Sequence, residues 1–138
     1  HDNKGGIFMS DLVLLDKAMK LYERYDNRSD TFEYLQYIAS KFKETDFKIA
    51  VYLLSALYNG YSESELIEFD NKIIEAVKLI IQNENAGNSF ISDIKENSIA
   101  RQLKIVDLQE QIRYYKRLNK DVETYEYKII ELLDFLQN

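Results

Sequence analysis

Apolar residues recur at spacings of three and four along most of the chain, which is the period of a helix with one buried face. No proline interrupts these stripes, and the chain has four glycines, so strong helix breakers are scarce. The pattern predicts about seven helices, over residues 10–26, 29–43, 46–58, 62–81, 90–95, 99–118 and 121–136. An all-α protein is therefore expected.

Local signals mark two of the expected helix boundaries. Asn59 and Gly60 follow the third apolar stripe. Glycine adopts the left-handed conformation at little cost, so this pair is expected to end the third helix. Ser62 and Glu65 stand three residues apart and form a capping box, in which each side chain satisfies a free backbone amide of the other. The fourth helix is therefore expected to begin at Ser62.

The third helix has the most apolar sequence in the chain. Residues 46–58 are apolar on nearly every side, which is typical of a helix at the centre of a bundle. The fourth helix is expected to break near Asn71, because asparagine is unfavourable in a helix interior. Residues 82–89 are rich in asparagine and form the most loop-like stretch. Together these features predict a compact, orthogonal bundle of about seven helices.

The chain is interpreted as one domain over residues 9–138. No internal repeat, low-complexity stretch or linker divides it. Residues 1–8 are interpreted as a cloning remnant, because Met9 stands just before a clear helix start. The single histidine is His1, so on this interpretation the native protein contains no histidine.

Composition excludes several classes of protein. The chain has 138 residues and no cysteine, which excludes disulfide-stapled scaffolds, cysteine-based zinc sites and thiol nucleophiles. Absence of cysteine fits a reducing compartment, and no signal peptide is visible, so a cytoplasmic location is expected. No apolar run approaches the roughly 18 residues that span a bilayer.

Charge argues against polyanionic partners. Lys and Arg number 18 against 24 Asp and Glu, which gives a net charge of -6. Such a chain lacks a general electrostatic attraction for DNA or for an anionic membrane. Residues 113–120 are locally basic with two tyrosines, but a helix with one tyrosine packed inward is the favoured interpretation of that stretch.

The residues provide few groups for catalysis. A serine nucleophile would lack a histidine base within residues 9–138, and no glycine-rich phosphate loop is present. Acidic pairs at helical spacing, among them Asp107 with Glu110, are typical of solvated helix faces. Asp107, however, directly follows the inward stripe of the sixth predicted helix. A carboxylate there needs hydrogen bonds, a cation, or a pairing with Lys104 or Arg101, and the pairing is favoured.

The region around Asp107 also resembles a known family. Residues 98–108, Ser-Ile-Ala-Arg-Gln-Leu-Lys-Ile-Val-Asp-Leu, resemble the last motif of HD-domain phosphohydrolases of the guanosine tetraphosphate hydrolase type. In that motif an Ala-Arg-x-Val-Lys-x-Ala-Asp-Leu pattern carries the aspartate that closes the metal site. Upstream stretches follow the order of the family's other motifs, at residues 34–37, 53–60, 74–79 and 88–94. The resemblance covers about residues 12–112 and implies an HD-like helical fold.

The same resemblance implies that the family's chemistry is lost. An HD site needs two histidines and two aspartates around a divalent cation that activates water. The matching positions here are Tyr37, Ser55, Ala56 and Asp107, and the acidic pair that follows the His-Asp motif is replaced by Asn59 and Gly60. One remaining carboxylate does not hold a transition metal. We therefore expect no cofactor and no metal-dependent hydrolysis.

Three functional hypotheses remain open from the sequence. The first is a catalytically inactive HD-like module for binding or regulation, with a nucleotide-like ligand held by Arg101, Lys104 and Asp107, or with a protein partner. The second is a phosphohydrolase that uses Mg or Mn at an unorthodox site built from Asp107, Glu63 and Glu65. The third is an unrelated helical protein-interaction domain. The oligomeric state does not follow from the sequence.

Overall fold

The computed structural model describes residues 7–25, 29–60, 62–118 and 123–138. These residues form eight helices and no strand, so the predicted all-α class is confirmed. The helices are α1 (Ile7–Tyr25), α2 (Ser29–Ala39), α3 (Thr45–Tyr58), α4 (Glu63–Leu66), α5 (Asn71–Asn85), α6 (Ile91–Glu96), α7 (Ser98–Arg117) and α8 (Glu123–Gln137).

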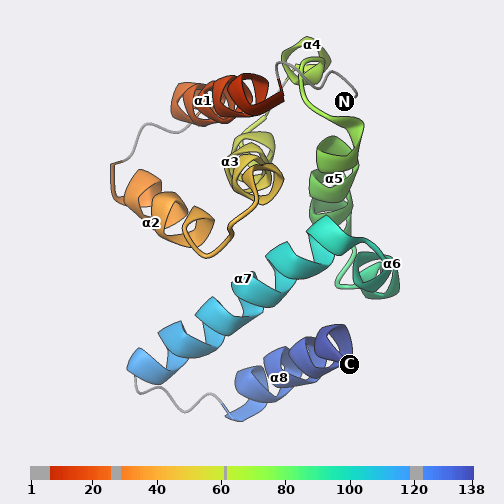
Figure 1. The fold of residues 1–138 in the computed structure, drawn as a ribbon. Helices are drawn as coiled ribbons and strands as arrows, with labels where there is room; N and C mark the ends of the chain where they lie inside the picture. The colour runs from red at the N-terminus through yellow and green to blue at the C-terminus, as the bar shows by residue number, and fades with distance from the viewer. Residues whose placement is uncertain (1–6, 26–28, 61, 119–122) are drawn as a thin grey trace.

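Helix α3 lies at the centre of the bundle, as its apolar sequence predicts. It packs against α1, α2, α5 and α7 (Figure 1). Seven of its residues are buried. Leu53, Ala56 and Ile49 are at most 1% exposed. Burying a leucine or isoleucine side chain contributes roughly 1.5–3 kcal/mol, so α3 is the main organiser of the core.

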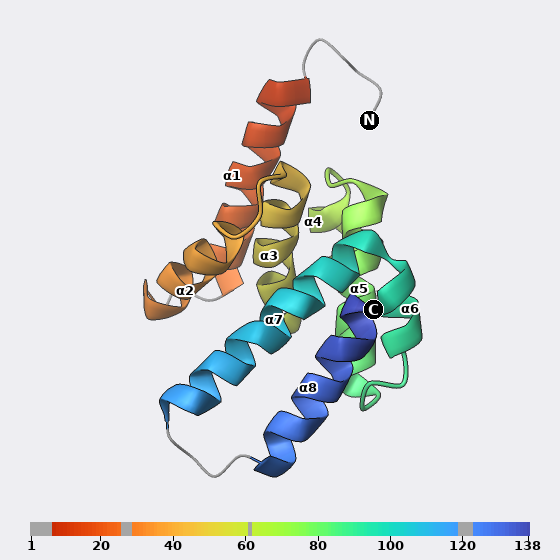
Figure 2. The same cartoon turned by 60° about the horizontal axis from the view of Figure 1, so that its bottom comes forward.

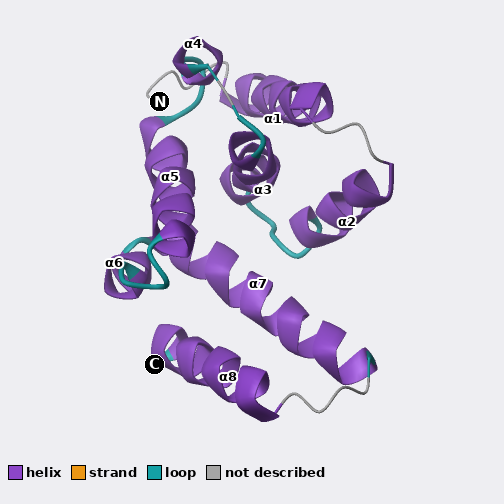
Figure 3. Cartoon of the chain, turned by 180° about the vertical axis from the view of Figure 1, so that it is seen from behind, coloured by secondary structure: helices purple, strands orange, loops and turns teal. Residues whose placement is uncertain are grey.

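Helix α7 crosses in front of α3 and α5 in the view of Figure 2, and α8 lies alongside α7. In this arrangement α1 and α8 lie on opposite sides of the molecule, which is also visible from behind (Figure 3). Among the described residues, no helix combines the length and apolar character needed to cross a bilayer.

The predicted fourth helix is two helices in the structure, so the described residues form eight helices rather than seven. The capping box at Ser62 and Glu65 is present and starts the short α4. The expected break near Asn71 is also present, because the Asp70 side chain accepts a hydrogen bond from the Lys72 amide at 2.9 Å. This cap starts α5 in a new direction.

The predicted loop over residues 82–89 is wrong in its first half, because α5 continues to Asn85. Asn83 is fully buried. Its side chain donates to Asn88 Oδ1 at 3.0 Å and accepts from the Phe90 amide at 2.9 Å. The buried amide therefore holds the turn that follows α5, in which Gly87 and Asn88 have positive φ angles of 59° and 70°.

The remaining boundaries agree with the predictions to within a few residues. Asn59 caps the end of α3, and Gly60 follows with a φ of 105°. Helix α1 begins at Ile7, three residues before the predicted start at Ser10. The cap predicted at Asp121 lies outside the described residues.

Candidate functional site

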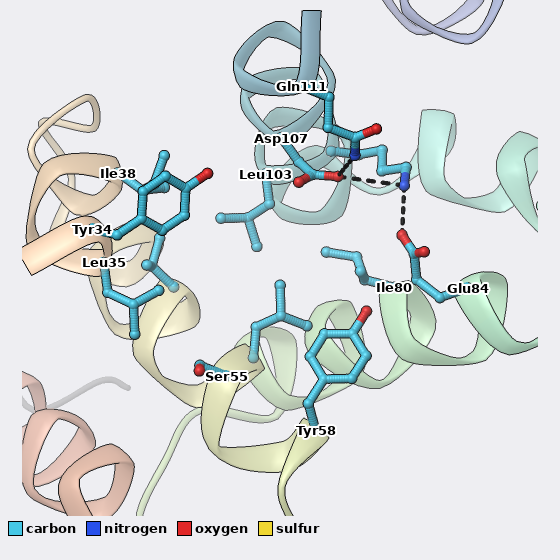
Figure 4. A pocket seen from close by; sticks show the side chains of 13 residues that line it. Tyr34, Leu35, Ile38, Ser55, Tyr58, Ile80, Glu84, Leu103, Asp107 and Gln111 are labelled. Atoms are coloured by element: carbon cyan, nitrogen blue, oxygen red, sulfur yellow. Dashed lines mark hydrogen bonds and ion pairs between the residues drawn. The ribbon is translucent and has the colours of Figure 1, made fainter. Parts of the chain in front are cut away.

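A pocket of about 330 Å³ opens between four helices (Figure 4). Its walls are mainly apolar, and its polar groups gather along α7 and at the end of α5. The residues that line it are Tyr34, Leu35 and Ile38 of α2, Val51, Leu54, Ser55 and Tyr58 of α3, Ile80 and Glu84 of α5, and Leu103, Lys104, Asp107 and Gln111 of α7.

A buried lysine organises the polar end of the pocket. The Lys104 side chain is 5% exposed, and its Nζ donates to Glu84 Oε1 at 2.5 Å. The same Nζ lies 3.6 Å from Asp107 Oδ2. Gln111 Nε2 donates to that oxygen at 2.9 Å. The pairing of Asp107 with Lys104 predicted from the sequence is therefore present, and Glu84 joins it.

The pKa of Asp107 reflects the position of its carboxyl group inside the pocket. Its side chain is 48% exposed, yet the surrounding pocket walls keep much of the solvating water away. This desolvation raises the pKa of Asp107 above its ordinary value, and the negative charge of Glu84 adds to the effect. The Lys104 charge and the Gln111 hydrogen bond oppose it.

Two tyrosines flank the polar end. Tyr34 and Tyr58 lie on opposite sides of the pocket (Figure 4). Burial raises the pKa of Tyr58 to about 12, with a further contribution from the charges of Glu84 and Asp107. Burial also raises the pKa of Tyr34, together with the charge of Asp107. Both phenols therefore stay neutral at physiological pH and can donate or accept hydrogen bonds.

The structure places Tyr37 outside this pocket, although the resemblance assigns it to the first ligand position. Its hydroxyl donates to Glu110 Oε1 at 3.1 Å and accepts from Arg113 Nη1 at 2.7 Å. Lys41 Nζ lies 3.5 Å from the same Glu110 oxygen. We call these four residues the α2–α7 clamp. Glu110 is 9% exposed, so its interpretation as part of a solvated face is wrong.

Other residues of the family-site comparison are also distributed differently. Ser55 lines the pocket, whereas Ala56 is fully buried in the core. Asn59 is exposed and donates through Nδ2 to the Ser55 carbonyl at 2.9 Å. Arg101 does not line the pocket. Of the expected set, the structure brings Ser55, Lys104 and Asp107 together.

These residues do not fit a divalent metal ion. Ala56 has no donor atom, the Tyr37 hydroxyl is engaged in the clamp, and the Lys104 ammonium stands 3.6 Å from the remaining carboxylate. An ammonium at that position would repel a cation bound there. Throughout the described ranges, no group of three or more acidic or histidine side chains is arranged to hold a metal.

The unorthodox oxygen site considered from the sequence is not assembled either. Glu63 pairs with Lys78 Nζ at 3.1 Å. Glu65 accepts hydrogen bonds from Arg24 and Tyr25 of α1. Both glutamates therefore tie α4 to its neighbours and do not line the pocket with Asp107.

Four polar residues of the pocket were not singled out as site residues from the sequence: Tyr34, Tyr58, Glu84 and Gln111. Gln111 carries a detectable signal, because it stands four residues after Asp107 and seven after Lys104, on the same helix face. Glu84 carries none, because it falls in the stretch predicted as a loop.

Comparison of the chain with protein-family models, with curated proteins and with solved structures finds no match in any of the three. The functional argument therefore rests on the geometry of the pocket.

Proposed function

We propose that this chain is a non-catalytic, HD-like helical module that binds a small, mainly apolar ligand between α2, α3, α5 and α7. The observation that carries the proposal is the pocket itself. Its volume of about 330 Å³ falls within the range of small-molecule sites. Apolar walls with a few polar groups at one end are typical of such sites, since the walls provide affinity and the polar groups provide orientation.

The HD-like part of the proposal is supported by two placements. Ser55 and Asp107 match two metal-ligand positions of the family in the ordered resemblance, and both line one pocket. Lys104 stands between Asp107 and Glu84. A domain that kept this hollow while losing the ligands would retain a binding site without the hydrolytic chemistry.

The polar groups argue against a phosphate-bearing ligand in this pocket. Lys104 is already engaged by two carboxylates, and Arg101 does not line the cavity. A phosphate would face Glu84 and Asp107 at short range, and like charges that are partly desolvated repel strongly. The nucleotide hypothesis is therefore weaker than binding of an apolar ligand.

The proposal is tested with N-phenyl-1-naphthylamine, an uncharged dye whose fluorescence increases in apolar surroundings. We expect saturable binding to the wild-type protein. Ser55→Phe fills the pocket from α3 and should abolish that binding. Ser92→Phe is the matched control, because Ser92 is exposed on α6, and should leave the binding unchanged.

Folding of each variant is checked by its helical circular dichroism and thermal midpoint. If Ser55→Phe does not fold, Ser55→Leu fills less space and replaces it. Equal dye binding by wild type and a folded pocket-filling variant would refute the pocket as the site. Absence of saturable binding in the wild type would refute the proposed function.

A further inference from the structure

The polar end of the pocket carries an excess of negative charge. Among the described residues that line the pocket, Lys104 is the basic residue and Glu84 and Asp107 are acidic. The Lys104 ammonium is closer to Glu84, at 2.5 Å, than to Asp107, at 3.6 Å. One ammonium neutralises one carboxylate, so the charge of Asp107 is largely left over.

The contacts of Asp107 are confined to one side of its carboxylate. Lys104 and Gln111 both approach Oδ2. In Figure 4 the other oxygen lies on the side of Tyr34, away from the lysine and the glutamine. A donor entering the pocket between Tyr34 and Tyr58 would reach this oxygen without displacing Lys104.

The flanking tyrosines suit a positively charged donor. Their side chains are about half exposed, 49% for Tyr34 and 50% for Tyr58, at the mouth of an otherwise apolar cavity. Aromatic faces attract cations that approach them, and neutral phenol oxygens accept hydrogen bonds from N–H groups. The two tyrosines and Asp107 thus surround one space with complementary electrostatics.

We propose that the ligand is a primary or secondary amine with a short apolar body. The body packs against the apolar walls formed by residues such as Leu54, Ile80 and Leu103. The protonated amine donates to Asp107 and lies between Tyr34 and Tyr58. This inference rests on the proposed function, since it names the class of ligand for the same pocket.

The charges of the pocket should give amines a higher affinity than carboxylates or alcohols of the same size. A carboxylate of the same size would bring a third negative charge beside Glu84 and Asp107. A neutral alcohol would keep the apolar contacts and a hydrogen bond to the carboxylate, and it would lose the attraction between opposite charges. Attraction between opposite charges adds to the hydrogen bond only when the donor is charged as well, so the ammonium should bind best.

The test is displacement of N-phenyl-1-naphthylamine by hexylammonium, hexanol and hexanoate at neutral pH. The amine of the dye is attached to aromatic rings and stays uncharged, so the dye reports occupancy of the apolar space. We expect hexylammonium to bind about tenfold more tightly than hexanol. Hexanoate should bind more weakly than hexanol.

Asp107→Asn keeps the shape of the side chain and removes its charge. It should abolish the preference for hexylammonium over hexanol, with the larger loss of affinity for hexylammonium. Asp93→Asn removes the same charge from an exposed position on α6 and should retain the full preference.

The outcomes distinguish the two proposals. Displacement of the dye by hexanol and hexylammonium with equal affinity would overturn the amine class and leave pocket binding intact. Tightest binding of hexanoate would also overturn it. Failure of the dye itself to bind would refute the proposed function, and the amine inference with it. Preservation of the ammonium preference in Asp107→Asn would refute the role of Asp107.

Discussion

Two carboxylates on α7 stand three residues apart and have opposite surroundings. Glu110 is 9% exposed, and its Oε1 is reached by the Tyr37 hydroxyl and Arg113 at about 3 Å and by Lys41 at 3.5 Å. Asp107 is 48% exposed and shares one lysine with Glu84. Glu110 therefore has an excess of donors, and Asp107 has a shortage of them.

The difference shows what each carboxylate does for the fold. A buried carboxylate with several donors joins the elements that supply them, and Glu110 joins α2 to α7. A partly desolvated carboxylate that shares its one lysine with a second carboxylate contributes little to stability. Carboxylates with a perturbed pKa cluster at functional sites, where a ligand can offset an unfavourable native interaction. The clamp therefore has the contacts of a structural element, whereas Asp107 has the surroundings expected of the proposed binding site.

The largest effect is expected from Lys104→Met, which removes the cation at the centre of the pocket. Glu84 and Asp107 would then repel each other without a compensating charge. We expect the free energy of unfolding to fall by about 2 kcal/mol at neutral pH, less than for a fully buried pair because both carboxylates reach water. Urea unfolding monitored by circular dichroism measures this loss.

The control for this prediction is Lys116→Met, on the exposed part of the same helix. It should change the free energy of unfolding by less than about 0.5 kcal/mol. The loss in Lys104→Met should shrink under acidic conditions, where carboxylates are protonated and no longer repel. A loss that is independent of pH would contradict the electrostatic explanation and indicate a packing effect.

An intermediate effect is expected from Glu110→Gln in the α2–α7 clamp. Glutamine keeps the shape and one acceptor, but it loses the charge that attracts Arg113 and Lys41. We expect a loss of about 1 kcal/mol in the free energy of unfolding. Glu75→Gln removes the same charge from an exposed position on α5 and should cost almost nothing.

The clamp lies outside the pocket, so Glu110→Gln should not change binding of the dye or of hexylammonium. A change in the preference for ammonium would show that the clamp and the pocket are not separate. Thermal and urea unfolding give the stability, and the dye titration gives the binding.

Much of the fold follows from the sequence, because helical periodicity and capping act locally. The capping box at Ser62 and the end of α3 at Gly60 depend on neighbouring residues, and both were predicted. The end of α5 was not, because Asn83 looks like a loop residue until its amide is paired with Asn88 and Phe90. That pairing depends on where the chain returns after the turn.

Part of the candidate site was predictable because helical periodicity is a local signal. Asp107 could be singled out because it follows an inward stripe on its own helix. The sequence does not distinguish Tyr34 from Tyr37 in the same way, because they lie almost one turn apart on α2. One reaches the pocket and the other reaches Glu110, and the placement of α7 decides between them. Site residues contributed by separate helices therefore need the three-dimensional arrangement.

The smallest expected effect has the opposite sign and comes from Asp107→Asn. The folded state raises the pKa of Asp107, so it binds a proton more readily than the unfolded chain. The stability linked to this group is present below the unfolded pKa of about 4 and is lost as pH rises through the folded value. At neutral pH we therefore expect the variant to be more stable than wild type.

The gain should be below about 1 kcal/mol, because half of the side chain is exposed and solvent screens the charge. Urea unfolding at neutral pH and near pH 4 should show the difference shrinking as the wild-type carboxyl becomes protonated. Asp93→Asn, which removes an exposed carboxylate from α6, is the matched control. A loss as large as that in Glu110→Gln would make both carboxylates structural and remove the distinction between them.

Comparison of the wild type with Asp107→Asn also connects stability to ligand binding. An ammonium ligand that neutralises Asp107 should stabilise the wild type by mass action and stabilise Asp107→Asn less. Saturating hexylammonium should therefore reduce or reverse the stability advantage of the variant at neutral pH, whereas hexanol should not. If both ligands shift the thermal midpoints of the two proteins equally, Asp107 makes no specific contact with the ligand. If hexylammonium alone reverses the stability advantage of the variant, then Asp107 destabilises the ligand-free protein and the bound ammonium offsets that destabilisation.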